Sequence, residues 1–154
     1  MDFTFDFLHG NLNGYSLPLS IVYTYTDAQF QSSFNSDFDG WGSGVEKGDQ
    51  LPYIAQNQLA INASLECKSL DFTFSSKYVG EMRTTAGKGD VAQQNRIDAQ
   101  LVIDLSANVH LTKQLSLFTA ARNITNQIYL VSRRPAGLRP GMPRNFQLGV
   151  KAIF

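Results

Sequence analysis

The sequence has little of what defines most secreted scaffolds, helical membrane proteins or nucleic-acid-binding domains. Its one cysteine, Cys67, excludes a disulfide within the chain and leaves the redox compartment open. No apolar run approaches the roughly 18 residues that a transmembrane helix requires. The formal net charge is zero, so the total implies neither nucleic acid nor an anionic surface as a partner. Five prolines and twelve glycines in an aromatic-rich chain favour β structure with many turns.

The balanced total hides an uneven distribution of charge. Residues 1–82 carry ten acidic and three basic side chains, a net −7, and residues 83–154 carry three acidic and ten basic ones, a net +7. The second half could therefore meet an anion. The two histidines, His9 and His110, belong to no Ser-His-Asp or paired-carboxylate arrangement, so the sequence does not predict an enzyme.

What the chain does have is alternation of apolar and polar residues. In residues 96–111 (RIDAQLVIDLSANVHL) every odd position is apolar, and every even position except Val102 is polar. Side chains of a strand alternate between two faces, so this pattern predicts one long strand with an apolar face and a polar face. Strands of soluble domains usually have ~5–6 residues, and a strand that crosses a membrane needs roughly 9–11. The length favours the wall of a barrel over a soluble sandwich.

The same alternation predicts about seven strands, and the connections between them run short, long, short, long, short, long. Outer-membrane barrels have short turns at one end and long loops at the other. The sequence therefore predicts an all-β fold, an antiparallel up-and-down meander that forms one domain over residues 1–154. The predicted strands are residues 2–8, 17–30, 57–67, 70–82, 96–111, 115–129 and 144–154, and the long loops are 31–56, 83–95 and 133–143.

Three features lie in the last 32 residues. Residues 123–126 (Asn-Ile-Thr-Asn) are followed by Tyr129, and a loop rich in glycine and proline ends in residues 141–144 (Gly-Met-Pro-Arg). The final alternating run ends on an aromatic residue and includes Gln147, Gly149, Ala152 and Phe154. Together these features resemble the closing segment of the TonB-dependent outer-membrane receptors, especially ferric-siderophore receptors of the ferric citrate type. The four residues of the final run are similar to the signal that the barrel-assembly machinery reads.

The resemblance implies a 22-stranded transmembrane β-barrel of which this chain is the C-terminal part. It implies uptake of a ferric siderophore, such as ferric citrate, into the periplasm, with the chelate as transported ligand and no cofactor. The partners it implies are outer-membrane lipid and lipopolysaccharide, the TonB complex through a plug domain, and the barrel-assembly machinery; nucleic acid is not among them. The sequence contains no recognisable plug or signal peptide, so we expect a fragment or a truncated gene product.

Arginines gather in two of the long loops and are the candidate ligand-binding residues. Guanidinium groups bind carboxylates through two parallel hydrogen bonds, which suits an anionic ferric chelate. The competing interpretation is that they brace the loops or contact lipopolysaccharide phosphates. Trp41 and Tyr53, in the first long loop, are the aromatic candidates. The candidate arginines are Arg83, Arg133, Arg134 and Arg139, with Arg144 beside them.

The first long loop also nearly satisfies the spacing of a calcium-binding EF-hand loop. The oxygen ligands would come from Asn35, Asp37, Asp39 and Glu46. Asn35 replaces the usual first aspartate, and the predicted flanking elements are strands instead of helices. A solvated acidic loop is the competing interpretation, and calcium is the less expected of the two.

Two other architectures stay open at this point. A soluble β-sandwich could recognise sugars through Trp41 and Tyr53, but it needs strands of ordinary length and two apolar faces that meet in a core. A small closed outer-membrane barrel of eight strands, with a structural role, needs an even number of strands and its own signal peptide.

Overall fold

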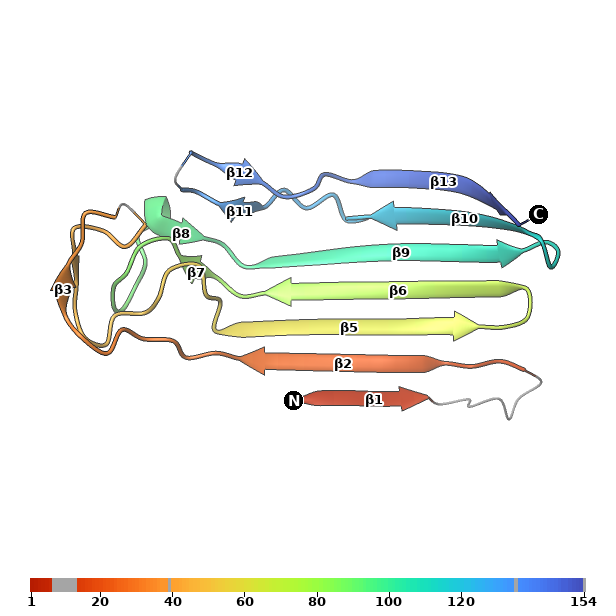
Figure 1. Cartoon of the computed structure of the whole chain (residues 1–154), viewed down its shortest axis with the longest axis horizontal. Coiled ribbons are helices and arrows are strands. Elements are labelled where there is room, and N and C mark those ends of the chain that lie inside the picture. The colour runs from red at the N-terminus through yellow and green to blue at the C-terminus, as the bar shows by residue number, and fades with distance from the viewer. Residues whose placement is uncertain (7–13, 39, 135, 154) are drawn as a thin grey trace.

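The computed structural model describes residues 1–6, 14–38, 40–134 and 136–153. Seven strands form one antiparallel sheet in the order β1-β2-β5-β6-β9-β10-β13, so each strand of the sheet pairs with the next one along the chain (Figure 1). The prediction of an all-β meander is confirmed. The strands are β1 (Asp2–Asp6), β2 (Pro18–Tyr25), β5 (Asn57–Glu66), β6 (Leu70–Val79), β9 (Gln100–His110), β10 (Leu115–Arg122) and β13 (Asn145–Ala152).

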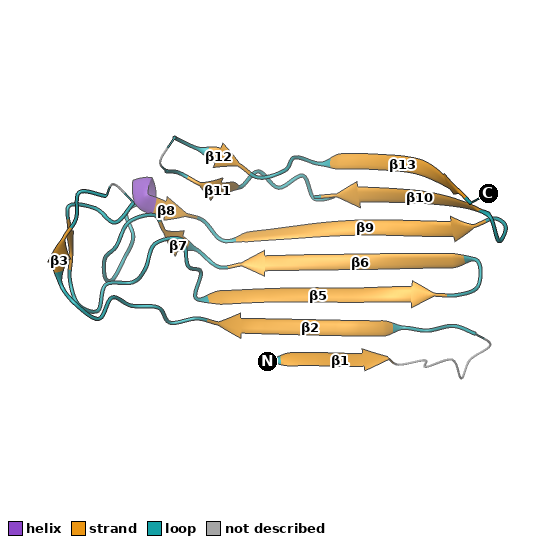
Figure 2. Cartoon of the chain, viewed as in Figure 1, coloured by secondary structure: helices purple, strands orange, loops and turns teal. Residues whose placement is uncertain are grey.

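The short turns and the long loops lie at opposite ends of the sheet (Figure 2). Each long loop contains a small hairpin: β3 (Phe34–Asn35) with β4 (Gly44–Val45), β7 (Met82–Arg83) with β8 (Arg96–Ile97), and β11 (Leu130–Ser132) with β12 (Arg139–Pro140). A 3₁₀ turn, η1 (Gln93–Asn95), precedes β8. Within the described ranges no helix has the length and apolarity to cross a membrane.

The strand register places most apolar side chains of the seven strands on one face of the sheet. Residues directly opposite each other in an antiparallel pair share a face. Phe74 lies opposite Leu105, and Leu105 lies opposite Ala121, which lies opposite Phe146. The other face carries mostly polar residues, which are even-numbered on β2, β5, β9 and β10 and odd-numbered on β6 and β13. Large apolar side chains of the first face are open to their surroundings, and Leu148 is 80% exposed.

The sheet is a single layer with two open edges. The described residues contain no second large sheet that could pack against it, so the β-sandwich alternative is wrong. The edge strands β1 and β13 do not pair with each other, so the sheet is not the small closed barrel either. Among the residues that the structure describes, few apolar ones are buried, and they gather near the long-loop end: Val45, Ala55, Val79 and Ile97.

Several predicted strands are wrong in extent. The predicted 96–111 strand is broken at residues 98 and 99, because Arg96 pairs with Arg83 in the β7–β8 hairpin and its Nε donates to Asp98 Oδ1 over 2.7 Å. The predicted 115–129 strand ends at Arg122, because Asn123 has a φ of 49° and turns the chain out of the sheet. The predicted 17–30 strand ends at Tyr25. Residues 7 and 8 of the first predicted strand lie outside the described residues.

Phe118 breaks the division between the two faces, because its aromatic ring lies on the polar face. It pairs with Gly149 across β10 and β13, and its ring occupies the space that a side chain at Gly149 would fill. Aromatic rings that cover a glycine on a neighbouring strand fix strand register. Gly149, predicted above as part of an assembly signal, thus has a packing role in the sheet; the assembly role stays a prediction.

We expect Gly149→Ala to lower the free energy of unfolding by about 1–3 kcal/mol, because the new methyl group would displace the Phe118 ring. The measurement is urea unfolding in detergent micelles. The matched control is Gly44→Ala in β4, where a methyl group meets no atom within 4 Å. The double variant Gly149→Ala/Phe118→Ala should lose less than the two single losses added together. Additive losses would contradict this packing.

Candidate functional site

Hydrogen bonds join the three long loops into one assembly at their end of the sheet. Gln50 N donates to Gly87 O over 2.9 Å, and Ala86 N donates to Trp41 O over 3.2 Å, which connects the first loop to the second. Lys88 Nζ lies 3.0 Å from Glu46 Oε2 and adds an ion pair across the same junction. The loops therefore act as a packed unit, in contrast to the open sheet below them.

Arg83 lies at the centre of this unit and is only 6% exposed. Its Nε donates to Gln50 Oε1 over 3.2 Å, and a terminal nitrogen donates to Gly89 O over 2.8 Å. A side chain at Gly87 would approach the other terminal nitrogen to 2.6 Å, so the guanidinium fills the space above that glycine. These contacts are those of a brace between loops. Ligand binding by Arg83 stays a prediction.

Tyr53 connects all three loops. Its backbone N donates to Arg83 O over 2.8 Å, and its hydroxyl accepts from the backbone N of Arg134 over 3.0 Å. Its φ of 60° is uncommon for a bulky residue and costs free energy. The bonds on both sides hold it there. Arg133 adds a second connection, because its Nε donates to Arg96 O over 2.7 Å.

Aromatic side chains of the first loop form a cluster around Trp41. The indole meets the rings of Phe30, Phe34 and Phe38 edge to face, with ring centroids 5.6, 5.6 and 5.5 Å away. Such aromatic pairs prefer this geometry, and their large area stabilises a loop that has few buried aliphatic residues. A cavity of about 250 Å³ opens beside the cluster, lined by Phe30, Phe38, Gly40, Trp41, Leu51, Pro52, Tyr53 and Arg134.

This aromatic cavity brings together three of the six predicted ligand-binding residues, namely Trp41, Tyr53 and Arg134. Arg83 and Arg133 pack between loops instead. Arg139 lies exposed on β12, and Arg144 is exposed before β13. Sequence reasoning missed Phe30, Phe38 and Leu51 as lining residues. For Phe38 and Leu51 the available signal was their apolar character within the polar loop 31–56, whereas Phe30 ended the predicted 17–30 strand.

The predicted calcium ligands belong to the β3–β4 hairpin and the residues that follow it. Asn35 pairs with Gly44, and Glu46 is engaged by Lys88. Asp39 lies outside the described residues, and the described ones contain no group of three His, Cys, Asp or Glu side chains placed to hold a metal ion. Calcium binding stays a prediction, and the Glu46–Lys88 pair does not support it.

The Asn-Ile-Thr-Asn motif forms a tight turn that ends β10. Asn123 is 1% exposed; its backbone N donates to Asp104 Oδ1 over 2.7 Å, and its side chain accepts from Gln127 N over 2.9 Å. Its Nδ2 donates to the carbonyls of Gln127 and Met142 over 2.9 and 3.0 Å. One amide therefore fastens both ends of the third long loop to the sheet. In this chain the Asn-Ile-Thr-Asn motif therefore has a structural role.

The rest of the resemblance lies in the same loop and the last strand. Gly141 packs against the ring of Tyr129, and its N donates to Tyr129 O over 2.9 Å. Gln147 and Ala152 lie on β13, opposite Ala120 and Leu115. Phe154, the terminal aromatic of the predicted assembly signal, lies outside the described residues.

The chain is similar in structure to receptors for iron chelates. It matches the ferric-catecholate import receptor Fiu from E. coli with a TM-score of 0.60 and 14% identity, over 99% of this chain and 27% of that chain. It matches the ferric enterobactin receptor PfeA from Pseudomonas aeruginosa with a TM-score of 0.60 and 14% identity, over 99% of this chain and 22% of that chain.

The fold is that of a section of a receptor β-barrel. The chain spans about a quarter of the length of these receptors, 27% of Fiu and 22% of PfeA. The open edges of the sheet agree with such a section. No protein-family model matches the sequence, and no curated protein matches it. At 14% identity the likeness shows the fold alone, a section of β-barrel wall.

We expect Asn123→Ala to lower the free energy of unfolding by about 2–4 kcal/mol, because buried donors and acceptors of the third loop lose their partners. Asn123→Gly, which accepts the positive φ without strain, should lose nearly as much if the amide contacts are what matter. Asn145→Ala on exposed β13 is the control and should change stability by less than about 0.5 kcal/mol. Full rescue by glycine would assign the effect to the backbone alone.

We expect Arg83→Met to lower the free energy of unfolding by about 2 kcal/mol, because two charge-assisted hydrogen bonds between the loops are lost. Thermal or urea unfolding in micelles measures it, and exposed Arg139→Met is the matched control. An Arg83→Met chain with unchanged stability would contradict the bracing role.

Proposed function

We propose that the chain is part of the barrel domain of a TonB-dependent receptor in the bacterial outer membrane, which takes up a ferric siderophore into the periplasm. Residues 1–154 would supply the C-terminal strands of the 22-stranded wall, and other segments of the complete receptor would supply the plug. Transport belongs to the complete receptor. This section would contribute three of its ligand-facing loops, and its role is binding instead of catalysis.

The apolar face of the sheet supports the membrane location. Large side chains on alternate positions of adjacent strands, including Phe72, Leu101 and Leu148, are exposed over one continuous face. A soluble protein rarely exposes so broad an apolar surface, whereas lipid covers it without cost. Lipopolysaccharide around the long loops, TonB acting through the plug, and the assembly machinery acting on β13 are the further partners that we propose.

The aromatic cavity supports ligand binding at the long-loop end, and it is the single observation that carries this part of the proposal. Aromatic residues, Leu51, Pro52 and Arg134 surround about 250 Å³. A site of this kind favours an anionic chelate that has flat aromatic groups, since the rings provide stacking area and a guanidinium balances charge. The exposed arginines Arg139 and Arg144 suit a carboxylate-rich chelate such as ferric citrate equally well.

Trp41 is the one tryptophan in the chain, so its fluorescence reports on this cavity alone. The experiment titrates the 154-residue chain in micelles with two gallium(III) complexes, one of a tris-catecholate and one of citrate, because gallium replaces iron without its strong quenching. We expect a saturating shift of the emission with the tris-catecholate complex. Saturation by the citrate complex alone would instead identify the citrate type.

Arg134→Gln tests the charge of the cavity. We expect it to weaken binding of the gallium complex by about tenfold, because a charge-assisted contact contributes roughly 1.5–3 kcal/mol. Arg139→Gln removes the same charge from exposed β12 and should change affinity less than about twofold if the ligand lies in the cavity. No response to either complex would overturn ligand binding at this site and leave the fold untouched.

A further inference from the structure

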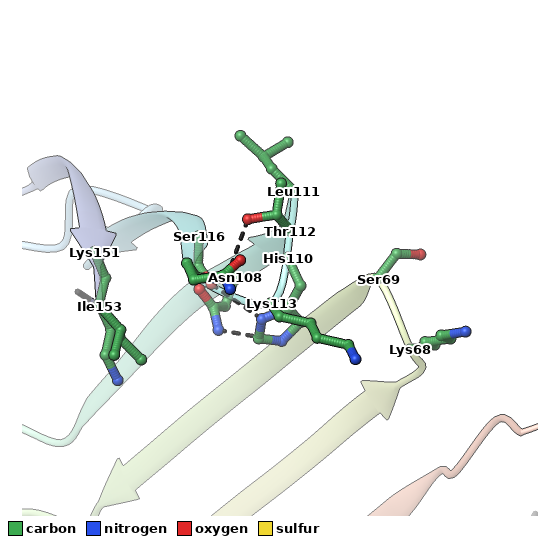
Figure 3. Close-up of a pocket in the computed structure, with 11 residues that line it drawn as sticks. Lys68, Ser69, Asn108, His110, Leu111, Thr112, Lys113, Ser116, Lys151 and Ile153 are labelled. Carbon is green, nitrogen blue, oxygen red and sulfur yellow. Dashed lines mark hydrogen bonds between the residues drawn. The ribbon is translucent and has the colours of Figure 1, made fainter.

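Two cavities lie at opposite ends of the sheet, and the chain builds them differently. The cavity at the short-turn end measures about 680 Å³ and is lined by two short turns and the ends of β9, β10 and β13 (Figure 3). Its histidine is held by neighbouring strands, because His110 Nδ1 lies 3.2 Å from Ser116 Oγ and Nε2 lies 2.8 Å from Asp71 Oδ2. The aromatic cavity is assembled from the first and the third long loop, which are far apart in the sequence. Its form therefore depends on how these two loops are attached to each other.

Arg134 is the contribution of the third loop to the aromatic cavity. Among the residues that the structure describes, the others that line this cavity all belong to residues 30–53. Both backbone polar groups of Arg134 are held: its N donates to the Tyr53 hydroxyl over 3.0 Å, and its O accepts from Ser132 Oγ over 2.8 Å. The Ser132 bond lies within the third loop. Of these two bonds, the one to Tyr53 therefore fixes Arg134 relative to the rest of the cavity.

Tyr53 is itself held in place against the local preference of the backbone. Its φ of 60° costs free energy for a bulky residue. Its backbone N donates to the carbonyl of Arg83 over 2.8 Å, and the Arg83 guanidinium donates to Gln50 and Gly89. The second loop thus fixes the tyrosine whose hydroxyl reaches the third loop. A hydroxyl on a ring fixed in this way is a defined acceptor for the Arg134 N–H.

From these contacts we propose that Tyr53 is a positioning residue for ligand binding: its hydroxyl holds Arg134 at the aromatic cavity, where Arg134 supplies positive charge. The inference rests on the anionic chelate of the proposed function and adds how its charge is met. A loop that is ordered before binding loses less conformational entropy when the ligand arrives, so holding the Arg134 backbone raises affinity. The Tyr53 ring keeps its contact area without the hydroxyl. The hydroxyl therefore controls the charge of the site, and the ring contributes to its packing.

The experiment titrates Trp41 fluorescence of the 154-residue chain in neutral micelles at several sodium chloride concentrations. The probe is the gallium(III) tris-catecholate complex, or the citrate complex if that one alone saturates. We expect Tyr53→Phe to weaken binding about fivefold at low salt, from the loss of one hydrogen bond. The variant should also flatten the dependence of Kd on salt, because salt screens the attraction that Arg134 provides. Tyr25→Phe removes the same hydroxyl from an exposed position on β2 and should change Kd less than about twofold.

The double variant Tyr53→Phe/Arg134→Gln distinguishes positioning from direct contact with the ligand. If the Tyr53 hydroxyl acts through Arg134, the double variant binds no more weakly than Arg134→Gln alone. Losses that add would overturn the proposal, because the hydroxyl would then act on the ligand itself. Unchanged affinity or unchanged salt dependence in Tyr53→Phe would overturn it as well, and would leave the binding site of the proposed function in place.

A measurement without ligand separates this proposal from the proposed function. Amide hydrogen exchange at Arg134 is followed by NMR in a chain with isotope-labelled arginine, and Arg134→Gln identifies the signal. We expect Tyr53→Phe to speed this exchange about tenfold, because the N–H loses its acceptor. Unchanged exchange would overturn the positioning of Arg134. If neither gallium complex binds the wild-type chain, the proposed function fails, and faster exchange still supports the positioning.

Ser132→Ala provides a second variant if Tyr53→Phe fails to fold. It removes the other hydrogen bond to the Arg134 backbone and leaves Tyr53 intact. We expect weaker binding of the gallium complex with the same flattened salt dependence, because Arg134 is again less firmly held. Unchanged binding in Ser132→Ala would then overturn the proposal.

Discussion

Every strand of the sheet depends on the same requirement: its apolar face has to be covered by something other than water. A single layer satisfies its internal backbone hydrogen bonds by strand pairing, yet it cannot bury its own side chains as a two-layer domain does. The apolar face would cost free energy in water, at roughly 25 cal/mol for each Å² of exposed apolar surface. Stability of the sheet is therefore a property of its surroundings as much as of the chain.

The long-loop end differs from the sheet because it contains a small core of buried residues. Val45, Ala55 and Ile97 are buried there, and Arg83 and Thr84 are buried beside them. The polar members keep their hydrogen bonds: Thr84 N and Oγ1 both donate to Asn95 O, over 2.8 and 3.2 Å. A loop assembly with satisfied polar groups and edge-to-face aromatic pairs holds its shape without a neighbouring layer. This is what allows a cavity of defined form to exist above an open sheet.

Alternation in the sequence predicts the strands of the sheet well, because period-two burial follows directly from strand geometry. The 57–67 prediction differs from β5 by one residue at its C-terminal end. The errors lie where side chains redirect the backbone. Alternation continues through Asp98 and Ala99, yet the Arg96–Asp98 bond and the pairing of Arg96 with Arg83 separate β8 from β9. The pairing of Arg96 with Arg83 joins two separate segments of the chain, and no local pattern contains it.

The candidate site divides in the same way. Residue type identified Trp41, Tyr53 and Arg134, which do line one cavity, but the equally plausible Arg83 is buried between loops. Gln50 and Gly89 each accept a hydrogen bond from the Arg83 guanidinium, and Gly87 leaves room for it. Arg83 is only 6% exposed and joins the first two long loops. Its hydrogen bonds stabilise the loops, and the loops in turn fix the shape of the neighbouring aromatic cavity.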